Sequence, residues 1–242
     1  MLTPIKIAFG EYMGRFYRSL VPTNAITQEF CERGLAKAIA WAPARMVDSA
    51  YEMLQAWQRN DTDSAPTRPP KIPVILVGMA RDWLPTGRDF TRQVAEPVKV
   101  EIPGDEKGRV FGLKTMAGDI RAQVAFFAHE ESTARALAAQ LLLFVDGVEN
   151  RRFNALYEFA GQKLPFPCSL EDPGAPGMLQ QVDEKNLTIL AVDLTLKATI
   201  PIFDAPRPGE ENDGLGIPGT DDPAGYPRVS GIDMNSKEAG GN

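Results

Sequence analysis

The sequence predicts an α+β fold, in which a mostly antiparallel sheet is packed by one main helix. Two different hydrophobic periods carry this prediction. Apolar residues fill alternate positions in Leu187–Phe203, whereas they recur at three- and four-residue steps in Ser132–Val148. Alternation is typical of a strand with one buried face, and the longer step is typical of one apolar stripe on a helix. An N-terminal helical extension and an extended C-terminal tail complete the predicted fold.

The segment from Ala117 to Phe203 is the predicted centre of this fold. Asp119–His129 (DIRAQVAFFAH) alternates between apolar and polar side chains, which predicts a half-buried strand. The helix of Ser132–Val148 follows, and the segment ends in a long antiparallel strand with one apolar face. The apolar face consists of Leu190, Val192, Leu194, Leu196, Ala198, Ile200 and Ile202.

Residues 1–70 form the predicted N-terminal helical extension. Apolar side chains at helical spacing in residues 2–20 indicate either a helix or an arm that orders against a neighbouring chain. Thr27 is the predicted cap of a second helix that runs up to Trp41. Pro43 suits the first turn of a third helix. The polar, proline-rich Asn60–Lys71 is a predicted loop or linker.

Shorter strands complete the predicted core domain, residues 71–203. Apolar runs and alternation predict strands, whereas proline and glycine predict loops. The strands are expected at Ile72–Val77, Val98–Ile102, Val110–Met116, Ala155–Phe159 and Met178–Val182, with a hairpin loop at Glu101–Arg109 and a proline- and glycine-rich loop at Lys163–Pro176.

The third predicted part is an acidic tail, residues 204–242. It holds five prolines, eight glycines, eight acidic and three basic side chains, so its net charge is −5 of the −6 of the whole chain. The segment has almost no apolar residues to bury, so burial alone cannot offset the entropy lost when it becomes ordered. We expect it either to be disordered or to lie extended along another chain.

Composition argues against several classes of protein. The acidic charge and the absence of a Lys/Arg cluster disfavour a nucleic-acid-binding surface. No apolar run is long enough to span a bilayer, and the first residues lack the features of a signal peptide. Cys31 and Cys168 fit no metal spacing, and two reduced thiols are expected.

The motifs of catalytic sites are missing from the sequence. His129 is the only histidine, and neither cysteine has the surroundings of a nucleophile that this histidine would serve as base. Phosphate-binding glycine loops and a G-x-S-x-G turn are absent as well. We therefore predict no enzyme, with no catalytic, cofactor-binding or metal-binding residues and no cofactor.

The region Asp119–Phe203 resembles the tail-terminator and neck proteins of long-tailed, contractile-tailed bacteriophages. The residues that carry the resemblance are DIRAQVAFFAHEESTARALAAQLLLFVDGV, then NALYEFAG, then VDEKNLTILAVDLTLKATIPI. They follow the family's order of a strand running into a helix, a short strand, a variable loop and a long outgoing strand.

The resemblance implies a structural virion protein of the neck that assembles in the cytoplasm of a bacterial host. Family members form hexameric rings that end the tail tube and sheath and join the tail to the head, and we expect a hexamer here. The implied partners are other copies of the chain, together with the tube, sheath and head-connector proteins. DNA would only pass through the channel, and no membrane is involved. The predicted subunit-interface residues are Arg121, Gln123, Arg135 and Gln140.

Three alternatives stay open from the sequence alone. The first is a head-to-tail connector or a protein associated with the tail tube. The second is an adaptor outside the virion that binds a partner through an exposed sheet edge. The third is a small hydrolase that uses His129.

Overall fold

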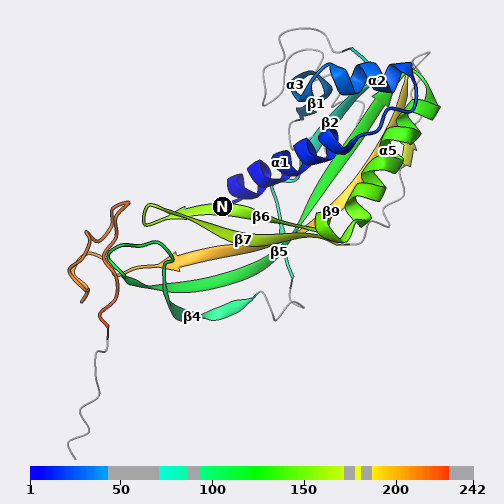
Figure 1. Ribbon diagram of the computed structural model, residues 1–242. Helices are drawn as coiled ribbons and strands as arrows, with labels where there is room; N and C mark the ends of the chain where they lie inside the picture. Colours follow the sequence, from blue (N-terminus) through cyan, green and yellow to red (C-terminus); the bar gives the residue numbers. More distant parts are fainter. Residues whose placement is uncertain (43–70, 87–92, 172–177, 181–186, 229–242) are drawn as a thin grey trace, which may run out of the picture. The chain divides into compact units, whose positions relative to one another are not determined.

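A computed structural model describes residues 1–42, 71–86, 93–171, 178–180 and 187–228 (Figure 1). The helix predicted after Pro43 lies outside these residues, and so does most of the loop predicted at Asn60–Lys71.

Three helices begin the described chain, and α5 with a short 3₁₀ turn separates two groups of strands. In chain order they are α1 Thr3–Ser19, α2 Ala25–Glu32, α3 Leu35–Ala38, β1 Ile39–Trp41, β2 Val74–Met79, β3 Leu84–Pro85, β4 Val94–Glu101, β5 Val110–Ala128, α5 Glu131–Asp146, the 3₁₀ turn η2 Val148–Asn150, β6 Arg152–Phe159, β7 Gln162–Glu171, β8 Met178–Gln180 and β9 Thr188–Asp204.

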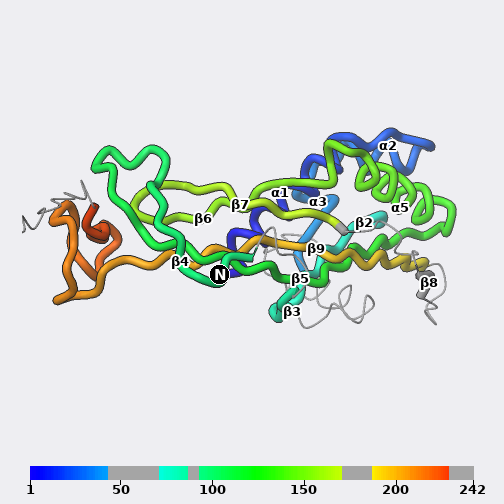
Figure 2. The backbone as a smooth tube through the Cα atoms, turned by 90° about the horizontal axis from the view of Figure 1, so that it is seen from below, coloured from blue at the N-terminus to red at the C-terminus, as the bar shows by residue number. Residues whose placement is uncertain are grey.

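All the described strands belong to one sheet. Its order is β1-β2-β5-β9-β7-β6, with β3 and β4 also pairing with β5 and β8 pairing with β9. Strands β5 and β9 are neighbours in this sheet (Figures 1 and 2). Strand β1 is parallel to β2, whereas β2–β5, β3–β5, β7–β9 and β8–β9 are antiparallel. The α+β class is confirmed, but the sheet is mixed rather than mostly antiparallel.

The parallel pair arises because the predicted second helix ends early. Gly34 has a φ of +89°, a value that side-chain-bearing residues rarely adopt, and it separates α2 from the single turn of α3. The residues up to Trp41 then become the short strand β1. Asn24 rather than Thr27 is the cap of α2, because the Asn24 side chain accepts a hydrogen bond from the Thr27 backbone N–H at 2.8 Å. The Thr27 hydroxyl oxygen accepts a bond from the backbone N–H of Asn24, which completes a capping box.

The chain divides into two compact units. Unit 1 comprises residues 1–93, 115–157 and 165–201, and unit 2 comprises residues 94–114, 158–164 and 202–242. The predicted boundaries at residues 70 and 203 stay a prediction, since the first of them adjoins residues that are not described.

The core of unit 1 lies between the sheet and the helices α1 and α5 (Figure 1). Within residues 2–20 the chain forms helix α1, whose side chains Ile5, Phe9, Tyr12 and Phe16 are at most 1% exposed. They share one buried cluster with Leu137 and Leu141 of α5, and with alternate residues of β5 and β9. Helix α1 is therefore part of the core of this unit.

Strand β5 departs from the predicted half-buried strand. The two strands predicted at Val110–Met116 and Asp119–His129 are one strand, and both of its faces are buried from Ala122 to Ala128. Alternate side chains pack under the helices, and the others pack with Val74, Leu76, Ile189 and Ala191 in a second cluster. The predicted strand Leu187–Phe203 is confirmed as β9, and the predicted helix is confirmed as α5.

Strand β7 occupies much of the loop predicted at Lys163–Pro176. Leu164, Cys168 and Leu170 are buried at alternate positions, while Pro165 and Pro167 are exposed. The two prolines precede the register with β9, which runs from Cys168 to Glu171, so their missing N–H groups do not interrupt those bonds.

Candidate functional site

Two of the four predicted interface residues meet at one carboxylate. Gln123 on β5 donates a hydrogen bond of 2.9 Å to Asp193 Oδ1 on β9, and Arg121 Nη2 lies 3.7 Å from Asp193 Oδ2. Gln123 is only 3% exposed, so it has almost no surface to offer another subunit. Arg121 is exposed and remains the accessible member of this group.

The other two predicted residues lie on α5, apart from that group. Gln140 accepts a hydrogen bond from the backbone N–H of Val21 at 2.8 Å and donates one to its carbonyl at 3.1 Å. It therefore holds the turn that follows α1. Arg135 is exposed and pairs with Glu131 one turn earlier on α5. An interface role for the four residues stays a prediction.

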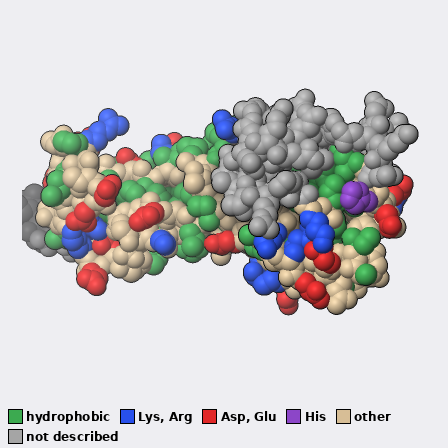
Figure 3. Space-filling view, turned by 90° about the horizontal axis from the view of Figure 1, so that it is seen from above, with side chains coloured by type: hydrophobic (Ala, Val, Ile, Leu, Met, Phe, Trp, Pro, Cys, Tyr) green, Lys and Arg blue, Asp and Glu red, His purple; other side chains and the backbone are tan. Residues whose placement is uncertain are grey.

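Residues with catalytic or metal-binding potential are dispersed. His129 is exposed at the end of β5, and it is the purple side chain in Figure 3. Neither Cys31 nor Cys168 takes part in a disulfide, and burial raises the pKa of Cys31. Within the described ranges, no group of three or more His, Cys, Asp or Glu side chains could hold a metal ion. In the same ranges, no helix is long and apolar enough to cross a membrane.

Strand β6 is the last strand in the sheet order, and among the described strands its outer edge is free. Ala155 and Tyr157 point into the core of unit 1, and the Tyr157 hydroxyl donates a hydrogen bond to the carbonyl of Met1. Leu156, between them, is 52% exposed. An unpaired edge with an outward apolar side chain can accept a further strand.

In unit 2, residues 204–228 fold back on their own chain, while residues 229–242 of the predicted tail lie outside the described residues. We call residues 204–228 the C-terminal clasp. The clasp is held by Arg109, whose side chain is 2% exposed. Its guanidinium donates two bonds of 2.9 Å to the Asp105 carboxylate, one to Asp222 Oδ1, and one of 2.8 Å to the carbonyl of Pro223. One buried cation thus joins the hairpin loop after β4 to the clasp.

Further bonds close the base of the clasp. The backbone N–H of Tyr226 donates to the carbonyl of Val110 at 2.7 Å, so Tyr226 extends the sheet by one isolated bridge. Asp213 Oδ1 accepts a bond of 3.0 Å from the N–H of Gly225. A Cβ atom at Gly225 would lie 2.8 Å from Arg109 Cβ, so this close approach requires glycine.

The charges around Arg109 shift several pKa values. The hydrogen bonds from Arg109 lower the pKa of Asp105, and bonds from Lys107 and Arg109 lower the pKa of Asp222. The same carboxylates raise the pKa of Arg109. The Tyr226 hydroxyl donates a bond of 2.6 Å to Asp204, which together with burial raises the pKa of this tyrosine to about 12.

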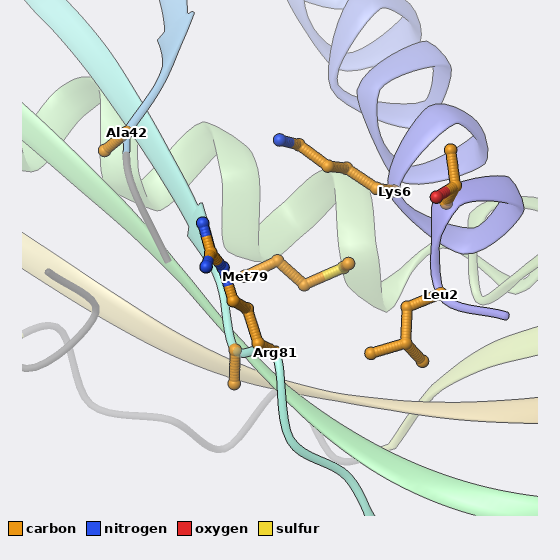
Figure 4. Close-up of a pocket in the computed structure, with 7 residues that line it drawn as sticks. Leu2, Lys6, Ala42, Met79 and Arg81 are labelled. Carbon is orange, nitrogen blue, oxygen red and sulfur yellow. The ribbon is translucent and has the colours of Figure 1, made fainter. Parts of the chain in front are cut away.

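A pocket of about 160 Å³ lies between the start of α1 and the end of β2 in unit 1 (Figure 4). The Lys6 side chain extends from α1 toward β2, and the Met79 side chain extends from β2 toward α1. Lys6 Nζ also lies 5.0 Å from the centre of the Trp41 ring. The pocket combines two cations with apolar walls, and its lining residues are Leu2, Thr3, Lys6, Ala42, Met79, Ala80 and Arg81.

Sequence reasoning missed both the clasp and the pocket. Asp105 stands four residues before Arg109, but nothing local indicates that Asp222, 113 residues later, completes the group. The pocket likewise joins Lys6 to Arg81 across two elements. The abundance of proline and glycine in residues 204–228 indicated a lack of helix and strand and concealed the folded turns.

Comparisons with known proteins give one structural likeness to report. No protein-family model matches the chain, and no curated protein matches it either. Among solved structures, a chain of the virion of a native gene transfer agent particle is similar over 81% of this chain and 97% of that chain. The TM-score is 0.32 at 8% sequence identity, which is too low to carry an argument about fold or function.

Proposed function

We propose that this chain is a structural virion protein that forms an oligomeric ring in the neck of a long-tailed phage. In this role it ends the tail tube and sheath and joins the tail to the head. Its partners are further copies of itself and the adjoining tube, sheath and head-connector proteins. The proposal assigns no catalysis and no cofactor to the chain.

The free edge of β6 is the observation that carries this proposal. Native sheets usually protect their edges with proline, with very short strands or with a covering element. Strand β1 is three residues long and β4 contains Pro97, whereas β6 has eight residues, no proline and the exposed Leu156 at its centre. A neighbouring subunit can pair with such an edge, and repeated head-to-tail pairing that closes on itself produces a ring.

The order of elements adds support. Strand β5, helix α5, strand β6 and the long outgoing strand β9 follow the family order that Asp119–Phe203 resembles. All three strands lie in one sheet, and α5 packs on it. Arg121, Gln123, Arg135 and Gln140 remain the proposed polar contacts between subunits. Arg121 and Arg135 are exposed, whereas Gln123 and Gln140 form hydrogen bonds within the subunit.

The oligomeric state tests the proposal directly. Native mass spectrometry and light scattering at micromolar concentration should show one closed oligomer, and electron microscopy should show rings with a central channel. Imaging of phage particles should place the protein where the tail meets the head. The proposal is refuted if the protein is a monomer at micromolar concentration and is absent from the phage particles. Density at the capsid vertex instead of the tube would favour a head-to-tail connector.

A further inference from the structure

We infer that the exposed tip of the C-terminal clasp docks on the Lys6–Arg81 pocket of a second copy of this chain. The tip consists of Glu210, Glu211, Leu215, Ile217 and Asp221, all exposed in unit 2. The inference rests on the proposed ring, because it names the two surfaces that would meet between neighbouring subunits.

The pocket has the chemistry to bind an acidic and apolar partner. Lys6 and Arg81 supply two positive charges, and Leu2 and Met79 supply apolar walls. In the part of the chain that the structure describes, no carboxylate forms an ion pair with Arg81, although several other arginines have one. A cavity of about 150 Å³ holds a benzene-sized group, so the pocket has room for one aliphatic side chain.

The clasp offers the complementary chemistry. Residues 204–228 contain six acidic and two basic side chains. Within them Leu215 is 48% and Ile217 is 65% exposed, so both aliphatic side chains are available to a partner. An aliphatic side chain can enter the pocket while neighbouring carboxylates face Lys6 and Arg81 at its rim.

The tip is also rigidly built, which favours binding. Leu215 N–H donates to Asp213 Oδ1 at 3.0 Å, and Ile217 N–H donates to the carbonyl of Asp222 at 2.9 Å. Arg109 also donates hydrogen bonds to Asp222 Oδ1 and to the carbonyl of Pro223. Because these bonds already order the loop, docking costs little further conformational entropy.

A second copy is the occupant that fits both surfaces. The two surfaces are different, so one copy's tip and the next copy's pocket form a heterologous contact. Such contacts generate a ring when the rotation between copies closes. Every subunit in the ring then has its tip bound and its pocket filled.

Charge reversal on each surface tests this docking. The measurement is the protein concentration below which the rings dissociate. We expect this concentration to be at least tenfold higher than for the wild type in Lys6→Glu/Arg81→Glu and, separately, in Glu210→Lys/Glu211→Lys. The four changes combined in one chain should restore assembly to within about threefold, because the opposite charges face each other again. Arg18→Glu/Lys37→Glu, two exposed cations elsewhere in unit 1, is the matched control and should assemble like the wild type.

Ile217→Lys provides a second variant at an exposed position, where folding is not at risk, and it should weaken assembly by a similar factor. Circular dichroism and thermal midpoints confirm that each variant is folded. The docking is overturned, while the ring stands, if the charge-reversed variants assemble like the wild type. It is also overturned if the quadruple variant assembles as weakly as the two double variants. If the wild type itself never assembles, the proposed function fails with it.

Discussion

At the scale of single residues, Arg109 has the greatest structural consequence. A guanidinium that is 2% exposed is tolerated because Asp105, Asp222 and the Pro223 carbonyl together satisfy four of its N–H bonds. Removing one partner of a buried pair leaves the other charge buried without compensation, which costs more than the pair contributes when intact.

Arg109→Ala should release the clasp and destabilise unit 2. The Asp105 side chain, 4% exposed, would lose both of its charge-assisted bonds, at a cost of about 3 kcal/mol. Hydrogen exchange should show loss of protection at the N–H of Tyr226, which bonds to Val110 across the clasp. Arg135→Ala removes a solvent-exposed pair and serves as the control, with little effect expected. Unchanged protection at Tyr226 would contradict the assigned role of Arg109.

The same group makes the clasp sensitive to acid. The pKa of Asp105 is lower in the folded protein than in the unfolded chain, so its contribution to stability is complete above the unfolded value of about 3.9. That contribution is lost as the pH falls through the folded pKa, because protonation removes the charge that Arg109 binds. Lys107, Arg109 and Asp222 face this carboxyl or share its partner.

Thermal unfolding of the wild type and Asp105→Asn between pH 2 and pH 7 measures this effect. The wild type should be more stable near neutral pH, and the difference should shrink toward the acid end. Asp146→Asn, which alters an exposed pair with Arg151, is the control. A difference that is the same at every pH would show that Asp105 acts without its charge.

At the scale of elements, α1 and β7 show how local patterns can be read in two ways. The apolar stripe of α1 predicted helix formation, but whether this helix packs on its own chain depends on a surface that the stripe does not specify. In β7 the prolines and glycines predicted a loop at Lys163–Pro176, whereas Leu164, Cys168 and Leu170 are buried on one face of a strand. In both cases pairing with a distant segment decided the outcome.

A pair of substitutions in α1 measures how far this helix is part of the core. Phe9 is fully buried and packs against Tyr12, Trp41 and Phe153, so Phe9→Ala should cost about 3–5 kcal/mol of unfolding free energy. Ile7 is 59% exposed on the same helix, and Ile7→Ala should change stability by no more than about 0.5 kcal/mol. Chemical denaturation would distinguish the two, and equal effects would mean that α1 is a peripheral arm.

At the scale of the whole molecule, assembly is the proposed activity, and it depends on the edge of β6. Leu156→Lys places a charge at the centre of this edge and should weaken ring formation at least tenfold in light-scattering experiments. Thr195→Lys, at an exposed position on the interior strand β9, is the matched control and should assemble normally. Because Leu156 is half exposed, the thermal midpoint should hardly change. Normal assembly of Leu156→Lys would exclude this edge from the subunit contact.

The sequence by itself determined the α+β class, helix α5, the long strand β9 and the hairpin between β4 and β5. These elements follow from periodicity. In a helix or a strand, side chains at a regular spacing lie on the same face, so the apolar pattern along the segment identifies the element. The resemblance of Asp119–Phe203 also depended only on this order. The role of Arg121 and Arg135 between subunits is still a prediction from the same patterns.

Only the tertiary structure decided the parallel pairing of β1, the burial of both faces of β5 and the clasp on Arg109. Gln123 was predicted to be an interface residue, and its burial beside Asp193 depends on a strand 70 residues away. The physical reason is the same in each case. A hydrophobic period reports how a segment meets its nearest surface, whereas a pair such as Arg109 and Asp222 exists only after the chain has folded back on itself.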